Sequence, residues 1–155
     1  MKRLEQLSVA EARGLEGVVI DVDDLLLDAG ALGPEVFAAL HELERARLRR
    51  VVCSARPAAW GEAIQHHWPV DLTVSENGAI AHLRRAGRLE RIDRYTASER
   101  GRRRAQLLSL VEQLRKRLPG LDLADDNLGR LSDVTFVAVD EALTEAAVRA
   151  AVDLG

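Results

Sequence analysis

The chain has 155 residues, 47% of them hydrophobic and 30% charged, and its formal net charge is −3. This composition predicts a globular chain with one core or two small lobes, and the weak charge and 3% aromatic content argue against nucleic-acid and anionic-membrane partners. No apolar run approaches the roughly 18 residues of a membrane span, and a single cysteine, Cys53, excludes an internal disulfide and suits a reducing cytoplasm.

The first half of the sequence predicts strands that alternate with helices. Short β-branched runs that end in polar residues, at 17–21, 49–54 and 70–78, are typical of buried strands. Helical spacing of apolar residues predicts one helix that begins at Pro34 and a shorter one opened by Pro57. Strands joined through helices by short connections imply right-handed crossovers and a parallel sheet.

The polar ends of these predicted strands fall at one edge of the sheet. Asp21 ends the first strand, Ser54 the second, and Glu76 and Asn77 the third. Ligands of open parallel sheets bind at the carboxyl ends of the strands. We therefore expect a ligand site at this edge.

The second half predicts a separate α+β lobe that begins near Ile80, which gives domains of 1–79 and 80–155. In chain order its predicted elements are a hairpin at 79–93 that turns at Ala86–Gly87, an amphipathic helix at 98–118, a mostly buried strand at 132–141 and a final helix opened by Asp140 or Thr144. The breakers Pro119 and Gly120 end the long helix.

Three stretches of the first half resemble motifs of haloacid dehalogenase-like (HAD-like) phosphatases, in the same order. "VVIDVDDLLL" (18–27) resembles the first motif, a strand followed by Asp-x-Asp, and "VVCSARP" (51–57) the second, a strand ending in Thr or Ser. "VSENGAI" (74–80) resembles the loop that leads into an inserted α+β (C2-type) cap. The resemblance implies an α/β fold, with part of a Rossmann-like, three-layered parallel core followed by that cap.

The same resemblance implies a Mg²⁺-dependent phosphatase that acts on a small phosphorylated metabolite, such as a sugar phosphate. Asp21 would be the nucleophile that forms an aspartyl phosphate, and Asp23 the acid/base that protonates the leaving oxygen and activates water. Residues two apart in an extended segment point the same way, so these two carboxylates are expected to share a pocket. By resemblance, the metal binds the Asp21 carboxylate and the main-chain carbonyl of Asp23.

Five further residues are predicted to bind phosphate or substrate. Ser54 would hydrogen-bond the transferring phosphoryl group, and Arg56 and Asn77 would reach the substrate from the same edge. Arg130 and Asp133 lie where the inserted lobe of similar proteins often faces the active site, and we predict that they help select the substrate.

The chain also departs from the family pattern. Leu25 replaces the usual Thr and Ala55 the usual Gly. The family's Lys motif and its acidic metal loop lie beyond the cap, and nothing in these 155 residues replaces them. We therefore expect a fragment or a degenerate relative that hydrolyses phosphate esters poorly and binds Mg²⁺ weakly. Its unfinished sheet edge favours self-association.

Two other functions remain open at this point. The chain can be a non-catalytic HAD-like binding or interaction domain that has lost turnover. It can also be a phospho-acceptor receiver domain, since receivers gather acids behind their first strand, but they place an acceptor Asp where this chain has Ser75, Glu76 and Asn77.

Overall fold

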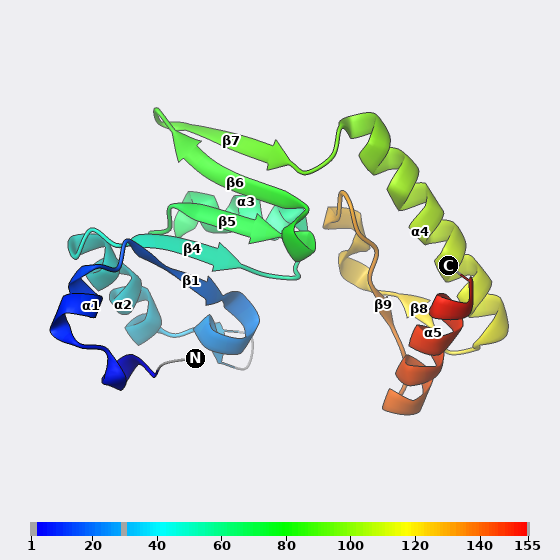
Figure 1. The fold of residues 1–155 in the computed structure, drawn as a ribbon. Helices are drawn as coiled ribbons and strands as arrows, with labels where there is room; N and C mark the ends of the chain where they lie inside the picture. Colours follow the sequence, from blue (N-terminus) through cyan, green and yellow to red (C-terminus); the bar gives the residue numbers. More distant parts are fainter. Residues whose placement is uncertain (1–2, 29–30, 155) are drawn as a thin grey trace.

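The structure is a computed structural model that describes residues 3–28 and 31–154, without the side chains of Leu4, Asp24 and Asp28. Figure 1 shows two lobes, a sheet with its helices and a smaller α+β lobe that begins with the long helix α4 (Ala97–Arg117). The connection between β7 and α4 joins the two lobes.

The first lobe is built on a five-stranded mixed sheet with the order β1-β4-β5-β6-β7. Its strands are β1 (Gly17–Asp21), β4 (Arg49–Cys53), β5 (Leu72–Ser75), β6 (Ile80–Arg85) and β7 (Arg88–Asp93). The first three are parallel, as the sequence predicts, and the last two add to β5 antiparallel. Asp21 pairs with Cys53, which pairs with Val74, so the three parallel strands end side by side.

The hairpin of β6 and β7 forms as the sequence predicts, but it belongs to the sheet of the first lobe. Ser75 pairs with Ile80, so β5 turns directly into β6. A boundary after residue 79 would cut through this sheet. We therefore propose that the second lobe begins after Asp93, because the chain leaves the sheet there.

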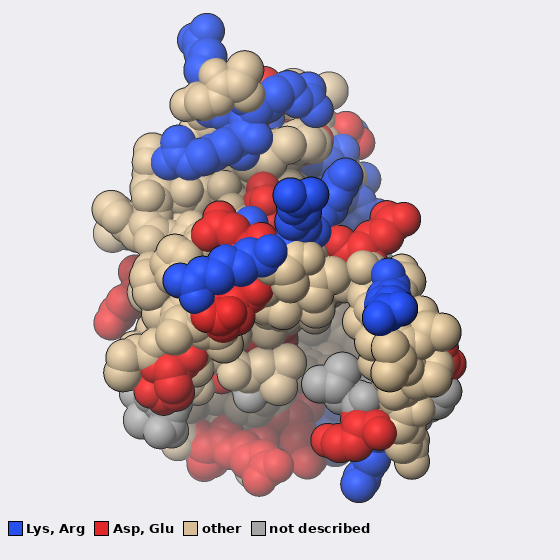
Figure 2. Space-filling model, turned by 90° about the vertical axis from the view of Figure 1, so that its left-hand side faces the viewer, with Lys and Arg blue, Asp and Glu red and all other residues tan. Residues whose placement is uncertain are grey.

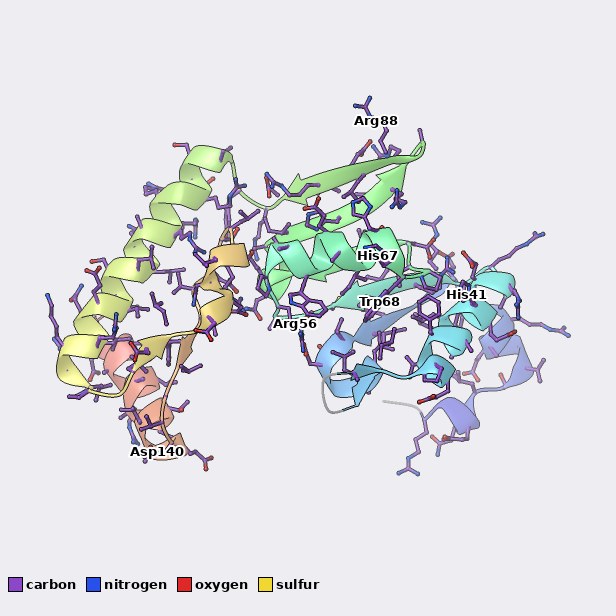
Figure 3. The ribbon with its side chains drawn as sticks, turned by 180° about the vertical axis from the view of Figure 1, so that it is seen from behind. His41, Arg56, His67, Trp68, Arg88 and Asp140 are labelled. Carbon is purple, nitrogen blue, oxygen red and sulfur yellow. The ribbon has the colours of Figure 1, made fainter. Side chains whose placement is uncertain are left out.

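One face of the sheet is covered by two helices, α2 (Pro34–Arg45) and α3 (Ala58–His67), as Figure 3 shows from behind. Their apolar faces meet the sheet in one core cluster, whose buried members are Val22, Leu26, Val52 and Ile64. On β1, an edge strand of this sheet, the Val19 side chain is 72% exposed. Of the two helical layers expected, the described residues therefore contain one.

Short elements complete the first lobe. They are η1 (Leu4–Gln6) and α1 (Val9–Arg13) before the sheet, the π-helical turn η2 (Val22–Leu26) and the small β2–β3 pair (Leu27–Asp28 and Ala31–Leu32) after β1, and η3 (Glu76–Gly78) after β5. The turn η2 is anchored by Val22 and Leu26, which are 0% and 7% exposed. This anchoring fixes the acidic loop directly after β1.

The second lobe packs two helices around a short strand pair. Its elements after α4 are β8 (Asp122–Leu123), η4 (Asp125–Gly129), β9 (Phe136–Val137) and α5 (Glu141–Leu154). Leu114, Leu121 and Ala147 form its buried core. Thr96 caps α4 by accepting the N–H of Glu99, and Asp140 accepts the N–H of Leu143 at the start of α5.

The strand expected over 132–141 is reduced to two residues. The N–H groups of Ser132 and Asp133 donate to the carboxylate of Glu76, at 2.6 and 3.0 Å, instead of to a neighbouring strand. The first residues of this segment are therefore bonded to the first lobe and are not paired in a sheet.

The surface carries charges of both signs. In Figure 2 basic side chains gather at the top, and acidic ones lie across the middle and at the bottom. Among the described residues, no helix has the length and apolar character needed to cross a membrane.

Candidate phosphoryl-transfer site at the strand ends

Asp21 and Asp23 lie at the end of β1 and in the turn that follows it. The Asp21 side chain accepts the backbone N–H of Asp23, with 2.9 Å between Oδ1 and N. Asp23 lies in the π-helical turn and not in an extended segment, so the turn, and not strand alternation, brings the two residues together. The bond joins the Asp21 carboxylate to the backbone of Asp23, and a pocket shared by the two carboxylates stays a prediction.

The second predicted pair, Ser54 and Arg56, lies against Asp23. Ser54 Oγ donates to Asp23 Oδ2 at 3.0 Å and accepts the N–H of Arg56 at 3.0 Å. The Arg56 guanidinium donates from Nε to Asp23 Oδ1 at 2.7 Å, and its Nη2 lies 2.6 Å from the same oxygen. Its other side faces Trp60, whose ring centroid is 4.6 Å away. The structure thus brings Asp21, Asp23, Ser54 and Arg56 into one contact group, which we call the rim.

The charge of Asp23 is stabilised by this arrangement. The hydrogen bond from Arg56 lowers the pKa of Asp23, partial burial opposes this, and the hydrogen bond from Ser54 and the Arg56 charge lower it further. The net direction is below the ordinary value of 3.8. Asp23 is therefore held as a carboxylate near neutral pH in this conformation.

The rim does not supply a complete magnesium site. Mg²⁺ requires near-octahedral oxygen coordination. Among the described side chains, no group of three or more acidic, His or Cys residues could hold a metal ion. The rim contributes two carboxylates, and one of them is already bound by Arg56 and Ser54. The donor set present thus falls short of what the ion needs.

The other three predicted residues lie at the junction between the lobes. The Asn77 amide donates to Asp133 Oδ2 at 3.1 Å, and Asp133 Oδ1 accepts from Arg130 Nη1 at 2.9 Å. Arg130 also donates to the carbonyl of Ala55 at 3.0 Å, and Ala55 directly follows the rim residue Ser54. The structure therefore brings these three side chains together, next to the rim.

The Arg130 guanidinium is buried and donates hydrogen bonds from Nε, Nη1 and Nη2. It is 6% exposed, and its Nε and Nη2 donate to the two carboxylate oxygens of Asp126 at 3.0 and 2.7 Å. Burial lowers its pKa, but the ion pairs with Asp126 and Asp133 outweigh burial and leave the pKa raised. Burial raises the pKa of Asp133, and the Arg130 pairing only partly offsets it. In this conformation Arg130 links the second lobe to the backbone directly after Ser54.

A cavity of about 650 Å³ adjoins this junction but not the acidic end of β1. Its wall includes Asn77 and Asp133 from the predicted site, together with Tyr95, Arg94 and Arg103. The four rim residues do not line it. The residues predicted to be the nucleophile and the acid/base therefore lie outside this cavity.

The comparisons with known proteins identify the fold. No family model and no curated protein matches the sequence. A Thermoplasma acidophilum protein, 0175, matches 91% of this chain at 16% identity with a TM-score of 0.76. BT1666 from Bacteroides thetaiotaomicron, a phosphatase of the haloalkanoate (HAD) superfamily, matches 93% at 19% identity with a TM-score of 0.51. ATP-bound IMP-nucleotidase of Plasmodium falciparum matches 90% at 10% identity with a TM-score of 0.60.

The chain has the HAD-like fold. This confirms the fold class implied by the three sequence motifs. The chain spans 58%, 49% and 41% of the lengths of these three solved chains. At such identities the similarity establishes the fold of the shared part.

Two further residues near the rim, Trp60 and Glu76, were assigned no role from the sequence. Trp60 contacts Arg56. It follows Arg56 and Pro57 by about one helical turn, and this spacing is the sequence signal that could have indicated the contact. Glu76 was expected at the sheet edge but was given no role. It is 1% exposed, and a buried acid directly after a strand is the signal for a structural carboxylate.

Proposed function

We propose that this chain carries the phosphoryl-accepting part of a phosphomonoester hydrolase, with Asp21 as the nucleophile and Asp23 as the acid/base. The observation that carries the proposal is the rim, where the Asp21 carboxylate accepts the backbone N–H of Asp23, and the Asp23 carboxylate accepts from the hydroxyl of Ser54 and the guanidinium of Arg56. The HAD-like fold and the phosphatase and nucleotidase among its structural neighbours support it.

The proposed reaction has two steps. An Asp21 carboxylate oxygen attacks phosphorus, the bond from phosphorus to the ester oxygen breaks, and Asp23 gives its proton to that oxygen. Asp23 then takes a proton from water, whose oxygen attacks phosphorus and releases inorganic phosphate from Asp21. Ser54, whose hydroxyl donates to Asp23 in this structure, turns to donate to a phosphoryl oxygen when substrate binds.

The position of Arg56 sets a condition on this reaction. While Arg56 pairs with Asp23, Asp23 resists protonation and is a poor acid. A bound phosphoryl group is a competing anion for the guanidinium, because arginine binds phosphate and carboxylate through the same fork of N–H donors. We therefore propose that substrate draws Arg56 from Asp23, which frees Asp23 to take a proton.

The substrate proposed is a small phosphorylated metabolite, such as a sugar phosphate. Asn77 and Asp133 present polar groups next to the rim that suit the hydroxyls of such a molecule. A bound Mg²⁺ would neutralise the phosphate, with Asp21 and Asp23 as its partial ligand set and the remaining ligands from elsewhere.

A second candidate is a phosphate-binding domain without turnover. The observation that favours it is the incomplete donor set, since the described side chains contain no three-ligand group for a metal. Hydrolysis of an aryl phosphate in the presence of Mg²⁺ distinguishes the two. Release that is slow but faster than that of Asp21→Asn supports the hydrolase, with Asp122→Asn, an exposed acid of the second lobe, as the matched control. Equal rates in the wild-type and Asp21→Asn chains would refute it.

A further inference from the structure

One buried carboxylate joins the two lobes. Glu76, directly after β5, is 1% exposed, and its two oxygens accept four backbone N–H groups. Oε1 accepts from Ala58 at 2.9 Å and from Leu131 at 2.7 Å. Oε2 accepts from Ser132 at 2.6 Å and from Asp133 at 3.0 Å. One donor thus belongs to the start of α3 and three belong to the second lobe.

The backbone at this position is strained, which indicates that the contact is maintained at a cost. Glu76 and Asn77 have φ values of 49° and 54°, in the left-handed region. Asparagine tolerates this conformation, but glutamate does so much less readily. Strained residues persist where the surrounding contacts over-determine them. The four hydrogen bonds to the Glu76 carboxylate are such contacts.

The charge of Glu76 fits this role. Burial raises its pKa, but the N–H groups of Leu131, Ser132, Ala58 and Asp133 together outweigh burial and leave the pKa below its ordinary value. The residue therefore stays ionised, and an ionised acceptor makes stronger hydrogen bonds than a neutral one.

The lobes also approach closely beside this carboxylate. A Cβ atom built on Gly129 of the second lobe would lie 3.3 Å from Pro57 Cβ and 3.4 Å from Ala59 Cβ, at the start of α3. Arg130 reaches back to the Ala55 carbonyl from the same segment. The contact between the lobes is thus centred on the end of β5 and the start of α3.

We infer that Glu76 is a positioning residue that docks the loop 131–133 of the second lobe onto the end of the sheet. Through this loop it sets where Asp133 and Asn77 lie relative to the rim. This inference concerns how the lobes are held and stands whether or not the rim hydrolyses phosphate.

Amide hydrogen exchange on the whole chain tests the inference. Glu76→Gln replaces one carboxylate oxygen by an NH₂ group, which cannot accept from the two N–H groups that face it. We expect the amides of 131–133 to exchange about tenfold faster or more, since hydrogen bonds to charged groups contribute most. The amides of the β1–β4 ladder should keep their protection.

Two control variants separate this role from general loosening. Glu90→Gln neutralises an acid of β7 that pairs with Arg85 at 3.5 Å, and it should leave the 131–133 amides unchanged. Asn77→Gly keeps the left-handed backbone and removes only the Asn77–Asp133 hydrogen bond, so protection should persist. Unchanged protection in Glu76→Gln, or equal loss in Asn77→Gly, would overturn the inference.

A measurement on the wild-type chain decides the case in which Glu76→Gln does not fold. Scalar couplings across hydrogen bonds should join the amide nitrogens of Leu131, Ser132 and Asp133 to the Glu76 carboxylate carbon. Their presence supports the docking contact. Their absence, in a chain whose β1–β4 couplings are observed, overturns it.

Discussion

The ion pair between Arg56 and Asp23 makes a prediction that can be worked through in numbers. Arg56→Gln removes the guanidinium and leaves Asp23 with its hydrogen bond from Ser54. The Arg56 and Asp23 side chains are 28% and 40% exposed, so solvent screens much of the Coulomb attraction. The expected loss in the free energy of unfolding is therefore about 0.5–1 kcal/mol at neutral pH, the upper part of the range for exposed pairs.

The pH dependence of this loss follows from the direction of the Asp23 pKa. Because Arg56 lowers that pKa in the folded chain, the stabilisation is present above the ordinary value of 3.8 and is lost as pH falls through the folded value. The difference between wild type and variant should be constant from about pH 8 to 5 and shrink below about pH 4. It should also shrink in 1 M salt, where the Debye length is about 3 Å.

Urea unfolding followed by far-UV circular dichroism measures this difference. Arg88→Gln, on the hairpin far from Arg56 in Figure 3, is the matched control and should change stability little. An equal loss in the control, or a loss that 1 M salt leaves unchanged, would refute the assignment of the effect to the ion pair.

Three further predictions concern the rim, the junction and the buried histidine. Asp21→Asn should abolish phosphatase activity of any active longer form while circular dichroism stays unchanged, and Asp23→Asn should be severely impaired; near-normal aryl-phosphate turnover by Asp21→Asn would contradict this. Arg130→Ala should lower the free energy of unfolding by about 1–2 kcal/mol in urea titrations, because it removes the hydrogen bonds of a buried guanidinium to Asp126 and Asp133, whose side chains are 40% and 22% exposed, and should raise KM for sugar phosphates; an unchanged KM would remove its role in substrate selection. His82 is 3% exposed and burial lowers its pKa, so the unfolded chain binds more protons and stability should fall below about pH 6.5, by at most about 1.4 kcal/mol per pH unit. His82→Leu should flatten this dependence in urea titrations between pH 7 and 5, and an equally steep dependence in that variant would contradict the assignment to His82.

The parallel part of the fold could be predicted because its signals are local. The β-branched runs that form β1 and β4, and the Pro at the start of α2, specify buried strands and a helix without reference to distant residues. The position of the hairpin could not be predicted in this way. Its alternating pattern indicates a hairpin, but only the pairing of β5 with β6 decides which lobe it joins.

The site shows the same division. The positions of Asp21 and Ser54 at one edge were predictable because the ends of parallel strands lie side by side. Asp23 and Arg56 were named from the motif resemblance. The ion pair of Arg56 with Asp23 depends on how two side chains that are 33 residues apart in the sequence meet. The hydrogen bonds of Arg130 depend on how the second lobe packs against the first. A sequence pattern contains no information on which carboxylate a given arginine reaches.

Transfer of a phosphoryl group to Asp21 tests the central claim most directly. The wild-type chain would be incubated with acetyl phosphate and Mg²⁺, quenched, reduced with borohydride and digested for peptide mass spectrometry. An aspartyl phosphate is reduced to homoserine, so the modified position identifies the nucleophile. The proposed function predicts homoserine at position 21, and none there in Asp21→Asn. Modification at position 23 instead, or equal low labelling of acids across the chain, would contradict it.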